Sequence, residues 1–519
     1  MRKIKKLKLH NYRRFQNLSL PFTEDRNILI GDNESGKSTI LSAIDLVLSG
    51  NRARIDNSIL EHIFNKDCIV SFLASQKDIS TLPVLFIELY LNDFEDHRVN
   101  GRNNSEHIEC NGLLFECIPD QELTEEISEI LSQPEPIFPF EFYTCSFFTF
   151  SGEPYNGYKR YLNFLNVDNS RIGSDYSHHE YVSGMYDRFS DEVEHYRHRN
   201  EYRKIKETFN ASSLVEVNSH TGSFNFGVKN DAKSNFINDL TIFEDGIPIE
   251  QKGKGRQCFV KTEFALSQTK RPLDVILLEE PENHLSHSNM RKLINNIEES
   301  AGAQLFIATH SNLICSRMDL RNSIMLGINS NIPLFLNDLS EDTAKYFMKA
   351  PDHSMLEFIL SKKVILVEGD AEYILMESFF ETVSGKTLDE AKVNVISVDG
   401  TSFNRYLEIA NIVKIKCAVV RDNDGNIERN CVTPYTDFIT EYIHIFFDND
   451  PERSTFERCI YRDNIRYCDI LWKEERRTLS VEDYMLSKKA QTSFELLESG
   501  LEGFKVPEYI KSAIVWINE

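Results

Sequence analysis

The stretch Gly31-Asp32-Asn33-Glu34-Ser35-Gly36-Lys37-Ser38 satisfies the pattern G-x-x-x-x-G-K-[ST] in full. It directly follows the apolar run 27–30, and the residues after it, 38–48, place their apolar side chains at helical spacing. A strand, a glycine-rich turn and a helix in this order gather backbone N–H groups and the positive end of a helix dipole around one point. The stretch therefore predicts a phosphate-binding loop.

The polar groups of this loop each have an expected partner on a bound nucleotide. The ammonium of Lys37 would reach the β and γ phosphates, and the hydroxyl of Ser38 would take a place on Mg²⁺. We expect ATP to be contacted by Gly31, Asn33, Gly36, Lys37, Ser38 and Thr39.

The composition limits the class of protein. A chain of 519 residues exceeds a single core, so about two or three domains are expected. The net charge of -23 argues against non-specific coating of nucleic acid, although metal ions and local basic patches can offset it. The 10 cysteines include no C-x-x-C pair, which favours reduced thiols in a cytoplasm. No stretch of about twenty apolar residues occurs, so we expect no membrane segment.

Two further predicted strands end in polar residues that suit a nucleotide site. The run 274–282 is apolar and ends in carboxylates, and the run 304–308 is followed by Thr-His-Ser. Glu279 is placed to hold Mg²⁺ through water, and Glu280 to orient the hydrolytic water. His310 is placed to sense the γ-phosphate.

These segments, together with the early Asn-Tyr-Arg-Arg-Phe stretch at 11–15, resemble an ABC-type ATPase of the branch that includes SMC and Rad50-like proteins. In that branch a signature loop from a second copy closes over the nucleotide. The turn at 253–257 resembles this loop, although Lys252 replaces its usual leading Ser. The resemblance implies dimeric ATPase heads in which Gly255 and Gln257 contact nucleotide, and a plain surface turn is the alternative.

Acidic residues also follow two predicted strands in the C-terminal region. Glu368 follows the strand at 363–367, and Asp422 and Asp424 follow the strand at 416–420. Adjacent strand ends would bring these carboxylates to one sheet edge, where hard oxygen ligands can hold Mg²⁺ or Mn²⁺. Glu368 alone could be an ordinary strand-end acid. The ordered combination of Glu-Gly-Asp-x-Glu and Asp-x-Asp favours a metal site.

The stretches 367–372 and 421–425 resemble the motifs of a TOPRIM domain, the metal-dependent fold of topoisomerases, primases and certain nucleases. An ABC ATPase followed by TOPRIM is the architecture of the OLD (overcoming lysogenization defect) family of nucleases. By this resemblance Glu368 is an acid or base, and Lys489 would stabilise the scissile phosphate, with Lys488 equally close in sequence. The implied metal ligands are Glu368, Glu372, Asp422, Asp424 and Glu457.

The sequence thus predicts an α/β protein with an ABC/SMC-like ATPase domain over residues 1–350 and a TOPRIM α/β domain over 351–519. Residues 95–215 are expected to form a helical insertion on the ATPase domain, acting as a dimerisation arm. Within this insertion the pattern predicts one long polar helix over 185–209.

The resemblance implies an ATP-binding, metal-dependent DNA endonuclease or nickase in anti-phage defence, as in Gabija or retron-linked effectors. It would act as a homodimer or larger assembly, with a separate partner protein or retron nucleic acid. The alternative is an SMC/Rad50-like ATP-switched DNA clamp whose TOPRIM domain has lost catalysis. A topoisomerase is less favoured, because no Tyr lies in a recognisable strand-passage module.

Overall fold

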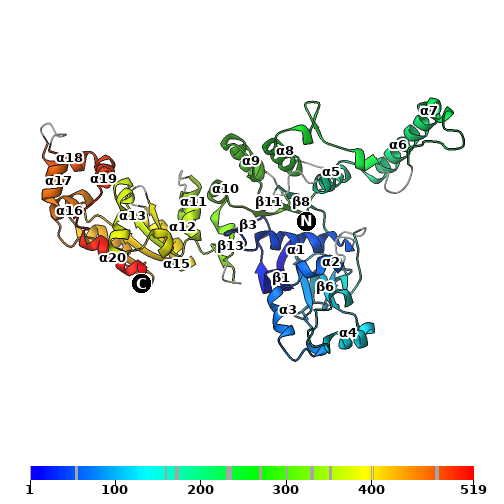
Figure 1. The fold of residues 1–519 in the computed structure, drawn as a ribbon, viewed down its shortest axis with the longest axis horizontal. Coiled ribbons are helices and arrows are strands. Elements are labelled where there is room, and N and C mark those ends of the chain that lie inside the picture. The colour runs from blue at the N-terminus through cyan, green and yellow to red at the C-terminus, as the bar shows by residue number, and fades with distance from the viewer. Residues whose placement is uncertain are drawn as a thin grey trace. The chain divides into compact units, whose positions relative to one another are not determined.

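The computed structural model divides the chain into two compact units, residues 1–310 with 324–333 and residues 311–323 with 334–519 (Figure 1). The predicted boundary between residues 350 and 351 lies outside the described residues, and the domain bounds stay a prediction. No helix among the described residues combines the length and apolar content needed to cross a membrane. The structure describes residues 2–52, 57–157, 161–169, 175–229, 236–267, 272–299, 302–327, 332–349, 354–398, 400, 402–473 and 479–519.

An antiparallel sheet begins the N-terminal unit (Figure 1). Along β1 (Ile4–Tyr12) Leu7 and Leu9 are buried, whereas Lys6 and Lys8, which alternate with them, are only half-buried, as in a strand with one covered face. Strand β7 (Tyr143–Thr149) pairs with β6 (Cys110–Pro119) and branches from the linear order of the other strands. The other strands, in spatial order, are β2 (Phe15–Pro21), β1 (Ile4–Tyr12), β4 (Leu85–Leu91), β6 (Cys110–Pro119) and β5 (Asn100–Gly101).

The second sheet of this unit carries the phosphate-binding loop. Its strands β3, β12, β11 and β8 are parallel and almost continuously apolar, as expected for strands covered on both faces. In spatial order the strands are β13 (Ser323–Met325), β3 (Arg26–Ile30), β12 (Gln304–Ala308), β11 (Val275–Glu279) and β8 (Phe164–Asp168).

Helices and a short hairpin complete the unit. The hairpin consists of β9 (Phe243–Glu244) and β10 (Ile247–Pro248). The helices are α1 (Lys37–Ser49), α2 (Asn57–Ile63), α3 (Lys66–Leu73), α4 (Thr124–Leu131), α5 (Asp175–Phe189), α6 (Glu192–Ser212), α7 (Val215–Ser219), α8 (Lys254–Leu266) and α9 (His287–Glu299).

The single helix predicted over 185–209 is wrong, because the chain breaks between α5 and α6. Asp191 caps the second helix: its side chain accepts a hydrogen bond from the backbone N–H of Glu194 at 2.8 Å, and the Glu194 carboxylate accepts from the Asp191 N–H at 2.9 Å. This capping box is the local signal for a helix start that the sequence interpretation missed.

The predicted insertion, residues 95–215, contains several kinds of structure. Strands β6 and β7 belong to the antiparallel sheet, and β8 pairs with β11 in the parallel sheet. The rest of the segment includes β5 and the helices α4, α5 and α6, and the role of the segment as a dimerisation arm stays a prediction.

The C-terminal unit contains a four-stranded parallel sheet (Figure 1). Its order is β16 (Val393–Ser397), β15 (Lys363–Val367), β17 (Lys416–Val420) and β18 (Ile443–Phe446). A two-residue strand, β14 (Leu334–Phe335), precedes it in the chain. The helices are α10 (Asn312–Arg317), α11 (Glu341–Lys349), α12 (Met355–Leu360), α13 (Asp370–Ser384), α14 (Leu388–Ala391), α15 (Phe403–Val413), α16 (Phe456–Asp463), α17 (Ile465–Leu471), α18 (Val481–Ser487), α19 (Lys489–Glu498) and α20 (Glu508–Asn518).

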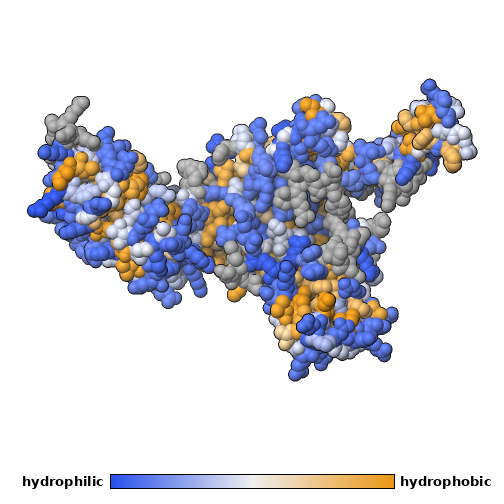
Figure 2. Space-filling view, viewed as in Figure 1, coloured by the Kyte–Doolittle hydropathy of each residue, from blue (hydrophilic) through white to orange (hydrophobic). Residues whose placement is uncertain are grey.

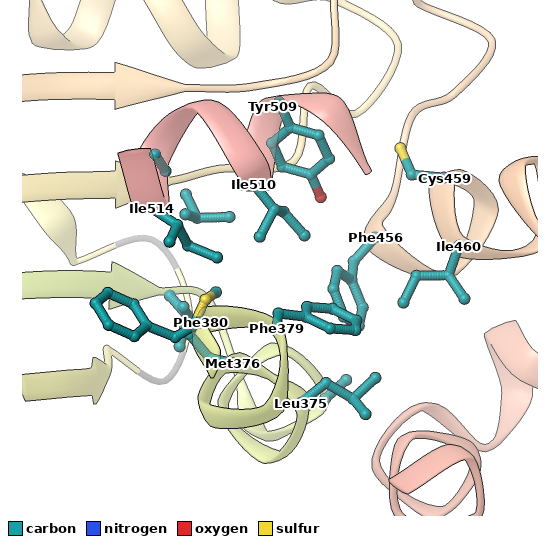
Figure 3. Close-up of a cluster of buried hydrophobic side chains, with 14 of the residues drawn as sticks. Leu375, Met376, Phe379, Phe380, Phe456, Cys459, Ile460, Tyr509, Ile510 and Ile514 are labelled. Carbon is teal, nitrogen blue, oxygen red and sulfur yellow. The ribbon is translucent and has the colours of Figure 1, made fainter. Parts of the chain in front are cut away.

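A large apolar core fixes α13 and α16 in this unit. In Figure 3 the side chains of Met376 and Phe379 on α13 lie near Phe456 of α16 and Ile510 of α20. Each fully buried side chain of this kind stabilises the fold by about 1.5–3 kcal/mol. Because α13 carries Glu372 and α16 carries Glu457, the core also sets the positions of two candidate ligands.

Candidate nucleotide site and candidate metal centre

The phosphate-binding loop joins the buried strand β3 to α1 as the sequence predicts. Gly36 caps α1 with a left-handed φ of 102°, and a Cβ at this position would lie 2.5 Å from the ring of Phe15. Only glycine meets both conditions without strain. The first-turn N–H groups of α1 are therefore presented beside the loop, where an anion can accept from them.

Lys37 lies inside the loop and is buried. Its Nζ donates to the carbonyl oxygens of Gly31 at 2.6 Å and Asp32 at 2.9 Å. Asn33 and Ser38 are exposed, and the hydroxyl of buried Ser35 has no hydrogen-bond partner among the described residues. The loop thus holds its lysine on backbone carbonyl oxygens, beside a buried hydroxyl without a partner among the described residues.

Residues at the ends of β11 and β12 meet beside this loop. The register pairs Glu279, at the end of β11, with Ala308, and the N–H of Glu280 donates to the Ala308 carbonyl at 2.9 Å. The Glu280 carboxylate accepts from Asn283 Nδ2 at 2.5 Å and lies 3.9 Å from His310 Nε2. Its backbone has a left-handed φ of 46°, a conformation that costs energy for a residue with a Cβ.

The pKa of His310 is shifted downward, which favours its neutral form. Burial lowers its pKa, and the nearby Lys37 ammonium lowers it further. The structure therefore brings Lys37, Glu280 and His310 to one place, as the sequence predicts for an ATPase site, with Glu279 next to them at the end of its strand.

Glu282 is a residue of this site that the sequence interpretation missed. Its Oε1 accepts from the Thr309 hydroxyl at 2.5 Å and from the His310 N–H at 2.8 Å. Burial raises the pKa of this carboxyl, and its Oε2 has no partner in the described part of the chain. The carboxylate ties the end of β11 to the end of β12, and its only sequence signal was its place at the end of Leu-Glu-Glu-Pro-Glu.

Gly255 lies in the first turn of α8, packed against another backbone segment. A Cβ there would lie 2.1 Å from the carbonyl oxygen of His284, so the close approach requires glycine. Gln257 Nε2 donates to the carbonyl of Lys252 at 2.8 Å. The contact of Gly255 and Gln257 with nucleotide on a second copy stays a prediction.

Two basic side chains at this turn share one acidic partner. Arg256 and Lys252 both bind the carboxylate of Glu244, Arg256 Nε at 3.0 Å, and these hydrogen bonds lower the pKa of Glu244 to about 2. Both cations thus stabilise the turn from within the chain.

The candidate metal centre lies at the carboxyl edge of the four-stranded sheet. Strands β15 and β17 pair in parallel with Leu366 opposite Val419, so Glu368 and Asp422 leave the same edge from neighbouring strands. Glu372 lies in the first turn of α13, Glu457 in the first turn of α16, and Lys489 begins α19.

Three carboxylates are buried close together here. Burial raises the pKa of Glu372 to about 7, and the negative charge of Glu457 adds to the rise. Burial also raises the pKa of Asp422 well above its usual value, with Glu372 and Glu457 adding to it. Lys489 Nζ lies 3.5 Å from Glu457 Oε1, whereas Glu457 Oε2 has no partner among the described residues.

Arg421 is the second residue that the sequence interpretation missed. Its buried guanidinium binds Glu368 through one terminal nitrogen and lies 3.4 Å from Asp424 through the other. The turn that carries it is held by Asn423, whose Nδ2 donates to the Asp448 carbonyl at 2.9 Å. The position of Arg421 directly before Asp-x-Asp was the available signal.

The predicted ligands therefore fall into a trio, Glu372, Asp422 and Glu457, and a pair, Glu368 and Asp424, held by Arg421. Among the described residues no group of three or more His, Cys, Asp or Glu side chains could hold a metal ion as it stands. The charge nevertheless fits a divalent cation, because three buried carboxylates face one lysine and one carboxylate oxygen lacks a partner. Binding a metal would require side chains to turn toward a common point.

Three protein-family models match the chain. Residues 2–133 match the "AAA ATPase domain" family, and residues 146–316 match the "AAA domain, putative AbiEii toxin, Type IV TA system" family. Residues 359–424 match the family described as "Overcoming lysogenization defect protein-like, TOPRIM domain". The chain therefore combines AAA-type ATPase domains with an OLD-like TOPRIM domain.

Individual proteins are similar over shorter or more distant stretches. The DNA replication and repair protein RecF of Lachnoclostridium phytofermentans is 51% identical over 43 residues, which is 8% of this chain and 12% of that relative's length. The C-terminal region of the Xanthomonas campestris pv. campestris OLD protein is 22% identical, covers 31% of this chain and 94% of its own, and gives a TM-score of 0.26. The SMC head domain from Thermotoga maritima is 15% identical, covers 64% of this chain and 97% of its own, and gives a TM-score of 0.28.

The family matches confirm the predicted resemblance and the predicted fold class. The chain is a mixed α/β protein with ATPase domains followed by an OLD-like TOPRIM domain, and this combination supports a nuclease-type ATPase.

Proposed function

We propose that this protein is an ATP-binding, metal-dependent DNA endonuclease or nickase, in which the ATPase domain regulates a TOPRIM nuclease centre. The observation that carries the proposal is the trio of buried carboxylates, Glu372, Asp422 and Glu457, at the sheet edge that also carries Glu368. Buried acids that raise one another's pKa are typical of functional sites rather than of stabilising ion pairs.

Two divalent metals bound at this edge would activate a water molecule and stabilise the leaving oxygen of the cleaved phosphodiester. The carboxylates of the trio and of the pair would hold them, and Mg²⁺ or Mn²⁺ suits such oxygen ligands. Glu368 would move the proton of the attacking water, and Lys489, beside Glu457, would contact the scissile phosphate.

The nucleotide site supports ATP binding with a regulatory role. Lys37 would exchange its two backbone carbonyl partners for phosphate oxygens, and Ser38 and Glu279 would hold the accompanying Mg²⁺. Glu280 would orient water, and neutral His310 would contact the γ-phosphate as an uncharged donor. Gly255 and Gln257 of a second copy would complete the site, making the heads a homodimer.

The arm formed by α6 and α7 supports assembly with a second copy. Figure 2 shows apolar side chains gathered over these helices. The exposed apolar residues of α6, α7 and the segment that follows them include Ile205, Phe209, Val215, Phe224 and Phe226, and Phe224 is 80% exposed. Exposed apolar side chains that gather on one surface mark an interaction site. We propose that the arm joins two copies.

The biological role proposed from the OLD-like domain is anti-phage defence, with a separate partner protein or retron nucleic acid. We place the protein in the cytoplasm because its ten cysteines are free thiols.

The test is incubation of the purified chain with supercoiled plasmid and Mg²⁺ or Mn²⁺, with and without ATP, beside Glu368→Ala and the matched control Glu377→Ala, an exposed acid on α13. Nicking or linearisation that only Glu368→Ala abolishes is the expected result. Cleavage that survives in Glu368→Ala, or depends on no metal, would refute the proposal.

A DNA clamp with a non-catalytic TOPRIM domain is the second candidate. The ion pairs of Arg421 with Glu368 and Asp424 favour it, because they occupy two of the carboxylates that a metal requires. Metal-independent DNA binding by wild type without cleavage in any lane would select the clamp.

A further inference from the structure

A cluster of cations lies in the C-terminal unit outside both candidate sites. It lines an open groove of about 560 Å³ between α11 and the start of α15. The lining side chains are Asp342, Lys345, Tyr346, Lys349 and Arg405. The three cations outnumber the one acid of the lining, Asp342, although the net charge of the whole chain is -23.

Hydrogen bonds join the two helices that line the groove. Glu408 of α15 accepts hydrogen bonds from the Ser340 hydroxyl at 2.9 Å and from the Thr343 hydroxyl at 2.5 Å, which fastens the start of α11 to α15. The Tyr346 hydroxyl lies 2.8 Å from the Ser402 hydroxyl across the same junction. These hydrogen bonds therefore fix the start of α11 against the start of α15.

Two of the three cations, Lys349 and Arg405, can bind an anionic ligand without breaking an ion pair that the structure describes. Lys345 is paired with Glu341 at 2.5 Å. Lys349 and Arg405 form no ion pair within the part of the chain that the structure describes. Arg405 lies 4.4 Å over the ring of Tyr346 and donates to the Asp342 carbonyl at 2.9 Å, so its planar group is held in place with further N–H donors to offer.

The groove shares an edge of the sheet with the candidate metal centre. Helix α15 follows β16, which pairs in parallel with β15, the strand before Glu368. Gly400, between β16 and α15, contacts the metal centre directly, because its N–H donates to the backbone carbonyl of Glu368 at 3.0 Å. The ring of Phe403, the first residue of α15, lies 5.7 Å from the guanidinium of Arg421.

We infer that this groove holds the sugar-phosphate backbone of the DNA that flanks the bond to be cut. The inference rests on the proposed nuclease function and adds the place where its substrate lies. Acids at the centre repel phosphate unless metal is bound, whereas Lys349 and Arg405 attract it without metal through charge-assisted hydrogen bonds. An open groove with charged walls suits an extended polyanion better than an enclosed small ligand, whose pockets are mostly apolar.

The test measures DNA binding by the full chain in EDTA, with a short fluorescein-labelled duplex followed by anisotropy across a salt series. Lys349→Ala and Arg405→Ala are compared with Lys386→Ala, an exposed lysine of the same unit. Each groove variant is expected to weaken binding about 5-fold and to lower the salt slope by about 1, for any duplex sequence. Lys386→Ala is expected to match wild type, and Arg405→Lys to retain part of the affinity, which excludes loss of the fold as the cause.

Wild-type affinity and salt slope in Lys349→Ala, Arg405→Ala and their double variant would overturn the inference, and Glu368-dependent cleavage by wild type would then leave the nuclease function standing. If wild type neither binds nor cuts DNA, both the inference and the proposed function fail.

Discussion

The nucleotide site and the metal centre handle charge in opposite ways. In the first, backbone carbonyl oxygens hold one buried cation, Lys37, and the first-turn N–H groups of α1 suit an anion. In the second, buried carboxyl groups outnumber the cations Arg421 and Lys489, and burial raises the pKa of Glu372 and Asp422 when no metal is bound. A site made from backbone in one short loop is preformed, whereas a site made from side chains on separate elements depends on its ligand for completion.

The largest expected effect comes from removing the cation of the preformed site. Lys37→Ala deletes the charge that would balance the β and γ phosphates, so ATP hydrolysis is expected to fall about 10²- to 10³-fold. Phosphate release from ATP measures it, and Lys66→Ala, an exposed lysine of the same unit, serves as control. Equal rates in Lys37→Ala and Lys66→Ala would mean that the loop binds no phosphate.

A smaller loss is expected from Glu282, which positions rather than contacts the nucleotide. Glu282→Ala frees Thr309 and the His310 N–H from their shared acceptor, so kcat for ATP hydrolysis is expected to drop about 10-fold with nucleotide affinity kept. Glu282→Gln retains an acceptor oxygen and is expected to fall in between. Steady-state kinetics separates kcat from KM, with Glu298→Ala as control. An unchanged kcat in Glu282→Ala would show that Glu282 does not position the groups that hydrolyse ATP.

In the metal centre, Arg421 binds two of the carboxylates that a metal would need. Arg421→Gln removes the cation that competes with metal for Glu368 and Asp424, so Mn²⁺ is expected to bind about 10-fold tighter, or about 1.4 kcal/mol. Titration calorimetry of Mn²⁺ without DNA measures this, beside Arg462→Gln, whose partner Glu452 is exposed. Weaker Mn²⁺ binding in Arg421→Gln would show that this arginine organises the ligands instead of competing with metal.

The last expected effect is a pH dependence of stability without metal. The folded-state pKa of Glu372 is raised from 4.5 to about 7, so the folded protein keeps a proton that the unfolded chain releases. This stabilisation, on the order of 3 kcal/mol, is complete below about pH 4.5 and lost as the pH rises through about 7.

Melting curves in EDTA are therefore expected to shift down by about 5 °C over this range, and Glu372→Gln to flatten the shift. Glu377→Gln on the same helix is the control. Added Mg²⁺ should restore stability above about pH 7, because metal binds the deprotonated ligands. A wild-type melting temperature that is flat with pH, or insensitive to Mg²⁺, would contradict the metal centre.

The sequence predicted best those elements that are set by residues close together in the chain. The phosphate-binding loop, the start of α1 at Lys37 and the strand at 304–308 follow from contiguous residues, because short-range spacing determines them. The shared edge of Glu368 and Asp422 also follows, since parallel strands end together. The ion pairs of Arg421 and the hydrogen bonds of Glu282 depend on which elements pack together, which spacing does not encode.

The most direct test of the central claim, that two separate sites divide nucleotide binding and DNA cleavage, is to measure both activities on wild type, Lys37→Ala and Glu368→Gln in parallel. A fluorescent ATP analogue reports binding, and supercoiled plasmid with Mg²⁺ or Mn²⁺ reports cleavage. Glu368→Gln is expected to bind nucleotide as wild type does and not to cut, whereas Lys37→Ala is expected to lose nucleotide binding, so that its cleavage no longer responds to ATP. Cleavage by Glu368→Gln, or loss of nucleotide binding in it, would contradict the account.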